Sequence, residues 1–164
     1  MEPLTDRDLR GCFVNASKGE VKRAPLPDLT EQPWDDLDYL GWVDPKAPQA
    51  GYLVTETDRH GLVGLALRRN HGSAHRARMC SLCTTVHGGT GVSLMVARRA
   101  GRPGRDGNTV GLDVCSGLDC SAYARGLVPV PAASAVHETL PVEARVARLR
   151  RNLDAFVERV LRAA

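Results

Sequence analysis

Two pairs of cysteines constrain this 164-residue sequence more than any other feature. Cys80 and Cys83 have C-x2-C spacing, and Cys115 and Cys120 have C-x4-C spacing. Two close thiol pairs can supply four thiolates in tetrahedral geometry, which zinc accepts without any redox demand. The spacing therefore predicts a fold built around one structural zinc ion, Zn2+, held by these four residues.

The segments around the pairs predict how they come together. Apolar residues near 92–97 and 109–114 indicate two strands, and Asp106-Gly107 in the glycine- and arginine-rich loop 98–108 is a turn signal typical of a β-hairpin. A short helix is expected at 121–125. Knuckle, hairpin and helix in this order form a treble-clef layout, and a helix N-terminus favours the negative charge of a thiolate cluster.

Other uses of these cysteines are weaker interpretations. Buried free thiols would not need paired spacing, a thioredoxin-like site would need a βαβ pattern, and a zinc deaminase would need an upstream His-x-Glu. An iron–sulfur cluster stays open, because four thiolates also bind iron. His87 follows Cys83 closely enough to replace a ligand if Cys115 pointed elsewhere. Cys12 lies outside the constellation and is expected in the core.

The rest of the sequence predicts an α+β chain. One or two short helices are expected within 4–24, and a β-hairpin is expected from the apolar runs at 52–54 and 62–67. Five prolines make 25–48 an irregular wrap, whose Trp34 and Trp42 pack on the body; a partner-binding face is the alternative. Apolar residues at intervals of three and four predict an amphipathic helix over 141–162.

Together these features predict an α+β fold class, in which a treble-clef zinc finger is embedded in a small antiparallel β-sheet domain. The expected division is an N-terminal helical and irregular wrap over 1–50, the zinc-finger domain over 51–130 and the C-terminal amphipathic helix over 140–164.

Charge is distributed unevenly along the chain. Residues 1–44 hold ten acidic and five basic residues, whereas residues 58–107 hold nine arginines and two acids. A basic middle of this kind can bind a phosphate backbone or an acidic protein face, although a solvated surface gives the same pattern. The candidate partner-contact residues are Arg68, Arg69, Arg76, Arg78, Arg98, Arg99, Arg102 and Arg105.

Composition and motifs also argue against several classes of protein. No apolar run approaches the ~20 residues of a membrane span, and the start of the sequence lacks the features of a secretory signal. An odd number of cysteines suits reduced thiols, so we expect a cytoplasmic monomer that contacts no membrane. No nucleophile elbow or phosphate loop occurs, and four thiolates would close the zinc to water, so we expect no enzyme activity and no catalytic residue.

The sequence resembles the elongation factor G binding proteins of the FusB type, in their C-terminal treble-clef zinc-finger domain. The resemblance is carried by the two cysteine pairs, GVSLMV at 91–96, NTVG at 108–111 and SAYARG at 121–126. FVNASKGE at 13–20 and WDDLDYLGW at 34–42 make it most similar to stand-alone actinobacterial-type members, over about residues 10–130.

This resemblance implies a non-catalytic zinc-binding protein that docks on translation elongation factor G, and in resistance-type members releases it from a drug-stalled ribosome. The chain departs from the family in one respect. Full-length FusB-type proteins carry a helical bundle before the zinc finger, and residues 1–50 are too short and proline-rich to form it. Zinc binding therefore carries over and drug resistance does not. The alternative function is RNA or ribosome binding through the arginine-rich hairpin.

Overall fold

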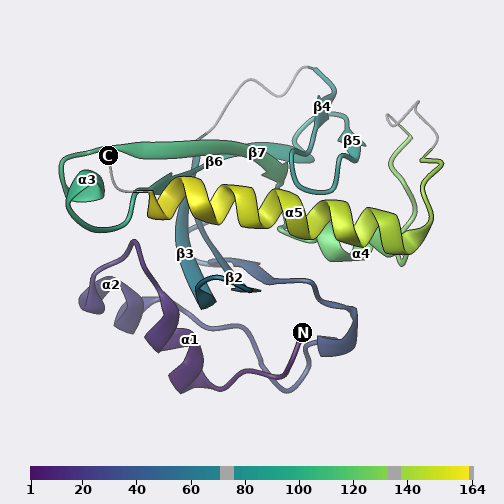
Figure 1. The fold of residues 1–164 in the computed structure, drawn as a ribbon. Coiled ribbons are helices and arrows are strands. Elements are labelled where there is room, and N and C mark those ends of the chain that lie inside the picture. The colour runs from purple at the N-terminus through teal and green to yellow at the C-terminus, as the bar shows by residue number, and fades with distance from the viewer. Residues whose placement is uncertain (71–75, 133–137, 163–164) are drawn as a thin grey trace.

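A five-stranded antiparallel sheet forms the centre of the fold, as a computed structural model describing residues 1–70, 76–132 and 138–162 shows (Figure 1). The strand order is β1-β2-β3-β6-β7, and β4 and β5 form a separate two-stranded sheet. The strands are β1 Leu40–Val43, β2 Ala50–Thr57, β3 Gly61–Asn70, β4 Arg78–Met79, β5 Val86–His87, β6 Val92–Arg98 and β7 Thr109–Cys115.

Two apolar layers cover the two faces of the sheet, because side chains alternate along each strand. Leu53 and Leu65, which are cross-strand partners, belong to the larger core beneath α5 (Val142–Leu161). Val54, the next residue on β2, belongs to a second core with Leu40 and Trp42. The predicted α+β class is confirmed, and so is the predicted β2–β3 hairpin.

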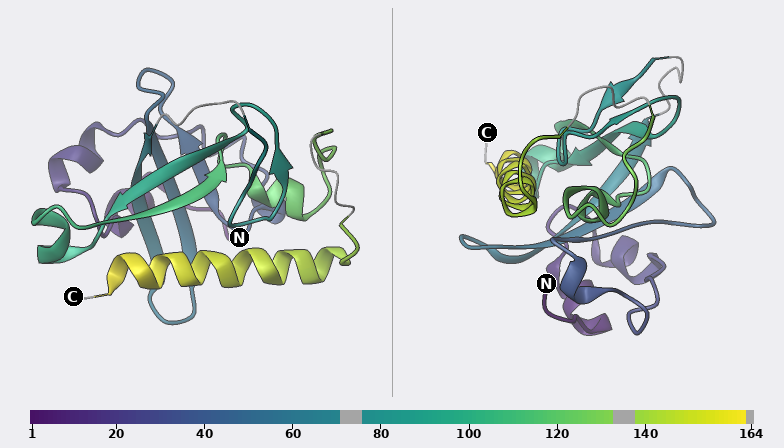
Figure 2. Two further views of the ribbon diagram at one scale, coloured as in Figure 1. Left: turned by 90° about the horizontal axis from the view of Figure 1, so that it is seen from above. Right: turned by 90° about the vertical axis from the view of Figure 1, so that its right-hand side faces the viewer.

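Helix α5 covers the face of the sheet that carries the larger core, the inner face, and crosses the β2–β3 hairpin (Figure 2). Its buried residues recur at intervals of three and four, so one stripe packs on the core. Pro141 is the N-cap and Glu143 lies in the first turn. The predicted amphipathic helix over 141–162 is confirmed. Its buried stripe consists of Leu149, Leu153, Phe156, Val157 and Val160.

The segment before β1 packs mainly on the other face of the sheet, the outer face, which carries the second core. Each of its two helices, α1 Asp6–Cys12 and α2 Lys18–Arg23, begins with a capping box. One or two short helices were expected within 4–24, and two are present. The prolines of 25–48 allow only the 3-10 helix η1, Trp34–Asp36, and the edge strand β1, which the sequence did not predict. The division of the chain into three parts stays a prediction.

Residues between α1 and α2 fill a fork in the sheet. Strand β3 pairs with β6 only over its last four residues, from Leu67 to Asn70. The earlier part of β3, from Gly61 to Ala66, is not paired with β6. Asn15 enters the gap: its Nδ2 donates to the carbonyls of Ala66 and Arg98, each at 3.0 Å, and its Oδ1 accepts from Ala66 N at 2.8 Å. The amide side chain therefore replaces missing ladder hydrogen bonds between two strands.

The predicted β6–β7 hairpin is confirmed, but its connection is not an open loop. It contains the short helix α3, Gly101–Arg105. Pro103 lies within the first turn, where a backbone N–H is not needed. A Cβ on Gly104 would overlap the carbonyl oxygen of Arg99, so only glycine fits there. Gly107 takes the left-handed φ of 91° that the predicted turn requires.

Candidate metal centre

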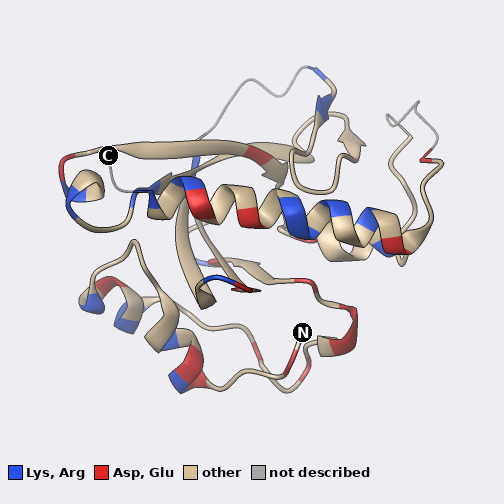
Figure 3. Ribbon diagram, viewed as in Figure 1, with Lys and Arg blue, Asp and Glu red and all other residues tan. Residues whose placement is uncertain are grey.

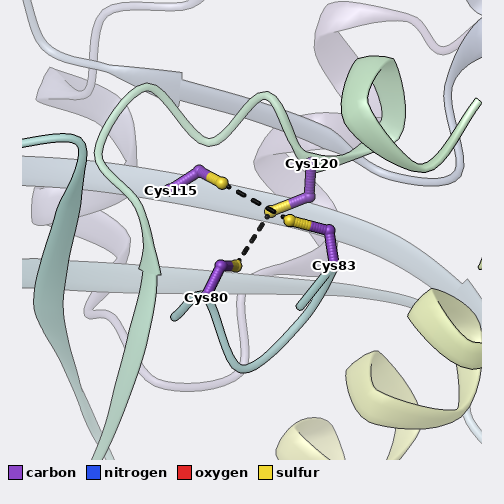
Figure 4. A group of neighbouring side chains, drawn as sticks. All are labelled: Cys80, Cys83, Cys115 and Cys120. Carbon is purple, nitrogen blue, oxygen red and sulfur yellow. Dashed lines mark hydrogen bonds between the residues drawn. The ribbon is translucent and has the colours of Figure 1, made fainter. Parts of the chain in front are cut away.

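Four buried thiols converge at one point beside the sheet (Figure 4). The sulfurs of Cys80, Cys83, Cys115 and Cys120 all lie within 4.8 Å of one another. Cys80 Sγ lies 3.6 Å from Cys120 Sγ, and Cys83 Sγ lies 3.5 Å from Cys115 Sγ. Four sulfurs bound tetrahedrally to zinc are separated by about 3.8 Å. The donor set therefore fits zinc in both chemistry and size.

A tight turn supplies the first pair. Cys80 N donates to the Thr85 carbonyl and Thr84 N donates to the Cys80 carbonyl, both at 2.9 Å. Thr84 has a φ of 64°, a left-handed conformation that is uncommon for a β-branched residue. Leu82 N lies 3.4 Å from Cys80 Sγ, as a donor to that sulfur. This turn aims both sulfurs of the C-x2-C pair in one direction.

The end of β7 and the start of α4, Cys120–Ala124, supply the second pair. The chain reverses between them through Leu118, which has a φ of 59° and donates its N–H to the Cys115 carbonyl at 2.9 Å. Tyr39 Oη lies 3.4 Å from Cys120 N and accepts its hydrogen bond. Knuckle, hairpin and helix thus follow one another as the sequence predicted, with the helix starting one residue earlier.

The cluster can hold four thiolates only when a cation neutralises them. Hydrogen bonds from Cys115 and then Cys120 lower the pKa of Cys80, whereas burial raises the pKa of Cys120. Burying one thiolate is costly, and burying four at this separation is unfavourable unless a divalent ion neutralises them. The zinc cofactor expected from the spacing is therefore supported by geometry and by charge.

His87 lies beside the cluster, not within it. Its Nε2 is 3.4 Å from Cys115 Sγ, and its ring packs edge-on against Tyr123 with the centroids 4.9 Å apart. Because Cys115 points into the cluster, no ligand position is left for His87 to fill. Zinc thiolates commonly accept hydrogen bonds from a second layer of residues. His87 occupies that layer.

Helix α5 anchors the knuckle from the other side. Asn152 Nδ2 donates to the Leu82 carbonyl at 2.9 Å, and Arg148 donates to the Cys83 carbonyl at 3.3 Å. These two residues are one helical turn apart, so they present their side chains to the same turn. This contact could not be predicted from the sequence, because helical periodicity identifies the buried stripe and not the polar residues that border it.

Most of the predicted partner-contact arginines already have partners within the chain. Arg78 pairs with Asp113, Arg98 with Glu20, and Arg102 with Asp106 at 3.6 Å. Arg99 donates to the carbonyls of Arg159 and Arg162 at the end of α5, and Arg69 donates to the Ser116 carbonyl. Within the described ranges, no such contact is found for Arg68, Arg76 or Arg105.

Cys12 is separate from the cluster, as expected. It belongs to the second core, and burial raises the pKa of its thiol to about 11. Such a thiol is unreactive at neutral pH.

None of the helices in the described part of the chain is both long enough and apolar enough to cross a membrane.

Comparison with known proteins agrees with this geometry. The family described as FBP C-terminal treble-clef zinc-finger matches residues 8–160. No curated protein matches the chain. Among solved structures, that of the fusidic acid resistance protein FusC is similar at a TM-score of 0.52 and 15% identity, over 87% of this chain and 54% of FusC. The chain thus spans about half the length of that relative. With a match over nearly its whole length and four thiols in the treble-clef arrangement, the chain belongs to the FBP C-terminal treble-clef zinc-finger family.

Proposed function

We propose that this chain is a non-catalytic, zinc-held docking module that binds translation elongation factor G in the cytoplasm. The four-cysteine treble clef, in a chain that belongs to the FBP zinc-finger family, carries the proposal. The likeness to FusC supports the fold, and the resemblance to elongation factor G binding proteins supplies the partner.

The proposed ligands of the zinc are Cys80, Cys83, Cys115 and Cys120, and the role of the ion is structural. Four thiolates fill a tetrahedral coordination sphere, so a water molecule activated for hydrolysis has no place on the metal. The ion instead fixes the knuckle against β7 and α4. Three further side chains hold the turns that carry the ligands. Tyr39 accepts a hydrogen bond at one turn, and Asn152 and Arg148 donate hydrogen bonds at the other.

Exposed arginines are the proposed contacts with the partner. Guanidinium groups pair with carboxylates through two parallel hydrogen bonds, which suits a docking surface. Arg68, Arg76 and Arg105 are exposed. The arginines with internal ion pairs contribute less to binding, since their charge is already compensated.

The direct test is capture of purified elongation factor G by the immobilised, zinc-loaded protein. We expect retention of the factor at moderate salt, and loss of retention after zinc is removed. Retention of ribosomal RNA in place of the factor, with a steep loss of binding as salt is added, would instead favour the RNA-binding alternative. Failure to retain the factor at any salt concentration would refute the proposal.

A further inference from the structure

An open groove of about 870 Å³ lies on the outer face of the sheet. The N-terminal segment covers the part of this face around Val54, and leaves uncovered a floor of small side chains, Ala50, Ala66 and Val96. Arg68 is the cross-strand partner of Val96, so its side chain projects from the same face. Helix α2 forms one wall, with Arg23 in the lining, and the β1–β2 connection forms another.

Most of the acidic charge in the groove is already committed. Glu20 accepts hydrogen bonds from Ser17 N at 2.7 Å and from Arg98, and the Ser17 contacts lower its pKa to about 2. Asp44 Oδ1 accepts from the backbone N–H groups of Lys46 and Ala47 at 2.8 and 3.2 Å. The Glu20 carboxylate therefore stays ionised, and both carboxylates already accept hydrogen bonds from the protein's own helix ends and turns.

Two of the basic side chains that line the groove have no such partner. Arg23 and Arg68 are both exposed, and neither has a carboxylate partner among the described residues. The stretches that the structure does not describe contain no aspartate or glutamate side chain in the sequence. Figure 3 shows acidic residues on the segment around η1 and basic residues on α2. The groove therefore offers two unneutralised guanidinium groups over a floor of small side chains.

We propose that this groove binds an extended acidic segment of a partner protein, with Arg23 and Arg68 pairing with its carboxylates. Small floor residues let the backbone of such a segment approach the sheet closely. The inference rests on the proposed function for the identity of the partner, elongation factor G, and on the groove alone for the chemistry of the contact.

Nucleic acid fits the same groove less well. Single strands bind through aromatic platforms on which bases stack. The aromatic rings in the lining are Phe13 and Tyr52, which pack edge to face at 6.0 Å. Tyr52 also stacks on Trp42 with the centroids 5.1 Å apart. These rings are engaged with one another, so the arginines would have to bind RNA through phosphates alone.

A pair of double variants tests the groove. Arg23→Ala with Arg68→Ala removes its two free charges, whereas Arg151→Ala with Arg162→Ala removes the same charge from exposed positions on and beside α5. Fluorescence anisotropy measures binding of a fluorescein-labelled glutamate-rich peptide and of a labelled oligouridylate with equal net charge. We expect the groove variant to bind the peptide about tenfold more weakly, and the control variant to bind it like the wild type.

Three results would refute the proposal that the groove binds an acidic segment. The first is no peptide binding by the wild type, and the second is equal peptide binding by all three proteins. The third is binding of the oligouridylate that depends on the groove and is tighter than binding of the peptide. Binding of elongation factor G by the same proteins separates the two proposals. If the groove variant binds elongation factor G as tightly as the wild type does, the groove is not the docking site, and the proposed function is unaffected. If the wild type binds the peptide through the groove but does not bind elongation factor G, the proposed function is wrong, and the groove is still a site for acidic segments.

Discussion

His87 Nε2 and Cys115 Sγ lie 3.4 Å apart, although 28 residues separate them in the sequence. The contact joins the end of β5 to the end of β7, so it links the strand that follows the knuckle to the second ligand pair. A Cβ on Gly91 would lie 2.6 Å from His87 Cβ, so the glycine is needed for the imidazole to reach the sulfur. Tyr123 packs edge-on against the ring, and the absence of a side chain at Gly91 leaves room for it.

Replacing His87 with phenylalanine should weaken zinc binding about tenfold, because the Cys115 thiolate loses a hydrogen-bond donor while the packing on Tyr123 is kept. His87→Gln retains an N–H donor and should keep most of the affinity. Competition with a chromogenic chelator measures both variants. Equal losses in the two would show that packing, and not the hydrogen bond, sets the affinity.

Removing the zinc should unfold the region around the β6–β7 hairpin. Thiolate zinc sites contribute apparent binding energies on the order of 10 kcal/mol, which matches the whole stability of a small domain. We expect Cys83→Ser and strong chelation to lower the thermal midpoint together with the zinc content. Cys12→Ser is the matched control, since it changes a buried thiol outside the cluster and should leave one zinc per chain. An unchanged midpoint in Cys83→Ser would contradict a structural role for the ion.

Gly41 lies against the turn that carries the second cysteine pair. A Cβ at this position would lie 2.7 Å from Leu118 Cβ and 2.8 Å from the Leu118 carbonyl oxygen. Gly41→Ala should therefore cost about 1–3 kcal/mol of folding free energy and weaken zinc binding, because Leu118 must shift. Gly11→Ala is the control: its Cβ would meet nothing within 4 Å, and alanine favours the helix. Chemical denaturation with and without zinc compares the two variants.

The sequence predicted the parts of this fold that depend on spacing and periodicity. Paired cysteines, alternating strands and the stripe from Leu149 to Val160 all follow local rules, so the sheet, the long helix and the converging thiols were predicted. Strand β1 was not predicted, because the prolines around it dominate its local signal while its stability comes from pairing with β2. Such a strand is specified by its neighbour and not by its own residues.

Contacts between distant polar side chains were the other part that could not be predicted. No local sequence pattern assigns a structural role to Asn15, yet its side chain bridges β3 and β6. The arginines of the basic middle were expected to contact a partner, yet most of them pair with carboxylates or carbonyls elsewhere in the chain. Charge along a sequence gives the total available to a surface, and only the fold shows which charges are already compensated.

The remaining prediction concerns Asp38, whose side chain is fully buried. Two arginines hold its carboxylate: Arg125 donates to both oxygens at 3.0 and 3.1 Å, and Arg150 Nε donates to Oδ1 at 3.0 Å. Ser121 Oγ also accepts a hydrogen bond from Asp38 N at 3.0 Å. The segment that precedes β1 is thereby tied to α4, which carries a proposed zinc ligand, and to α5.

Asp38→Asn removes the negative charge and leaves two guanidinium groups without a carboxylate between them. Breaking a buried ion pair by removing one partner costs about 3–5 kcal/mol, and the lower end applies here because Arg150 can turn to solvent. Denaturant unfolding of the zinc-loaded protein measures the loss. In a second variant, Arg150→Met, the Arg125 contact remains, so the loss should be under about 1 kcal/mol. A loss in Asp38→Asn no larger than that in Arg150→Met would show that the buried carboxylate does not hold the segment before β1 on the zinc-binding half of the fold.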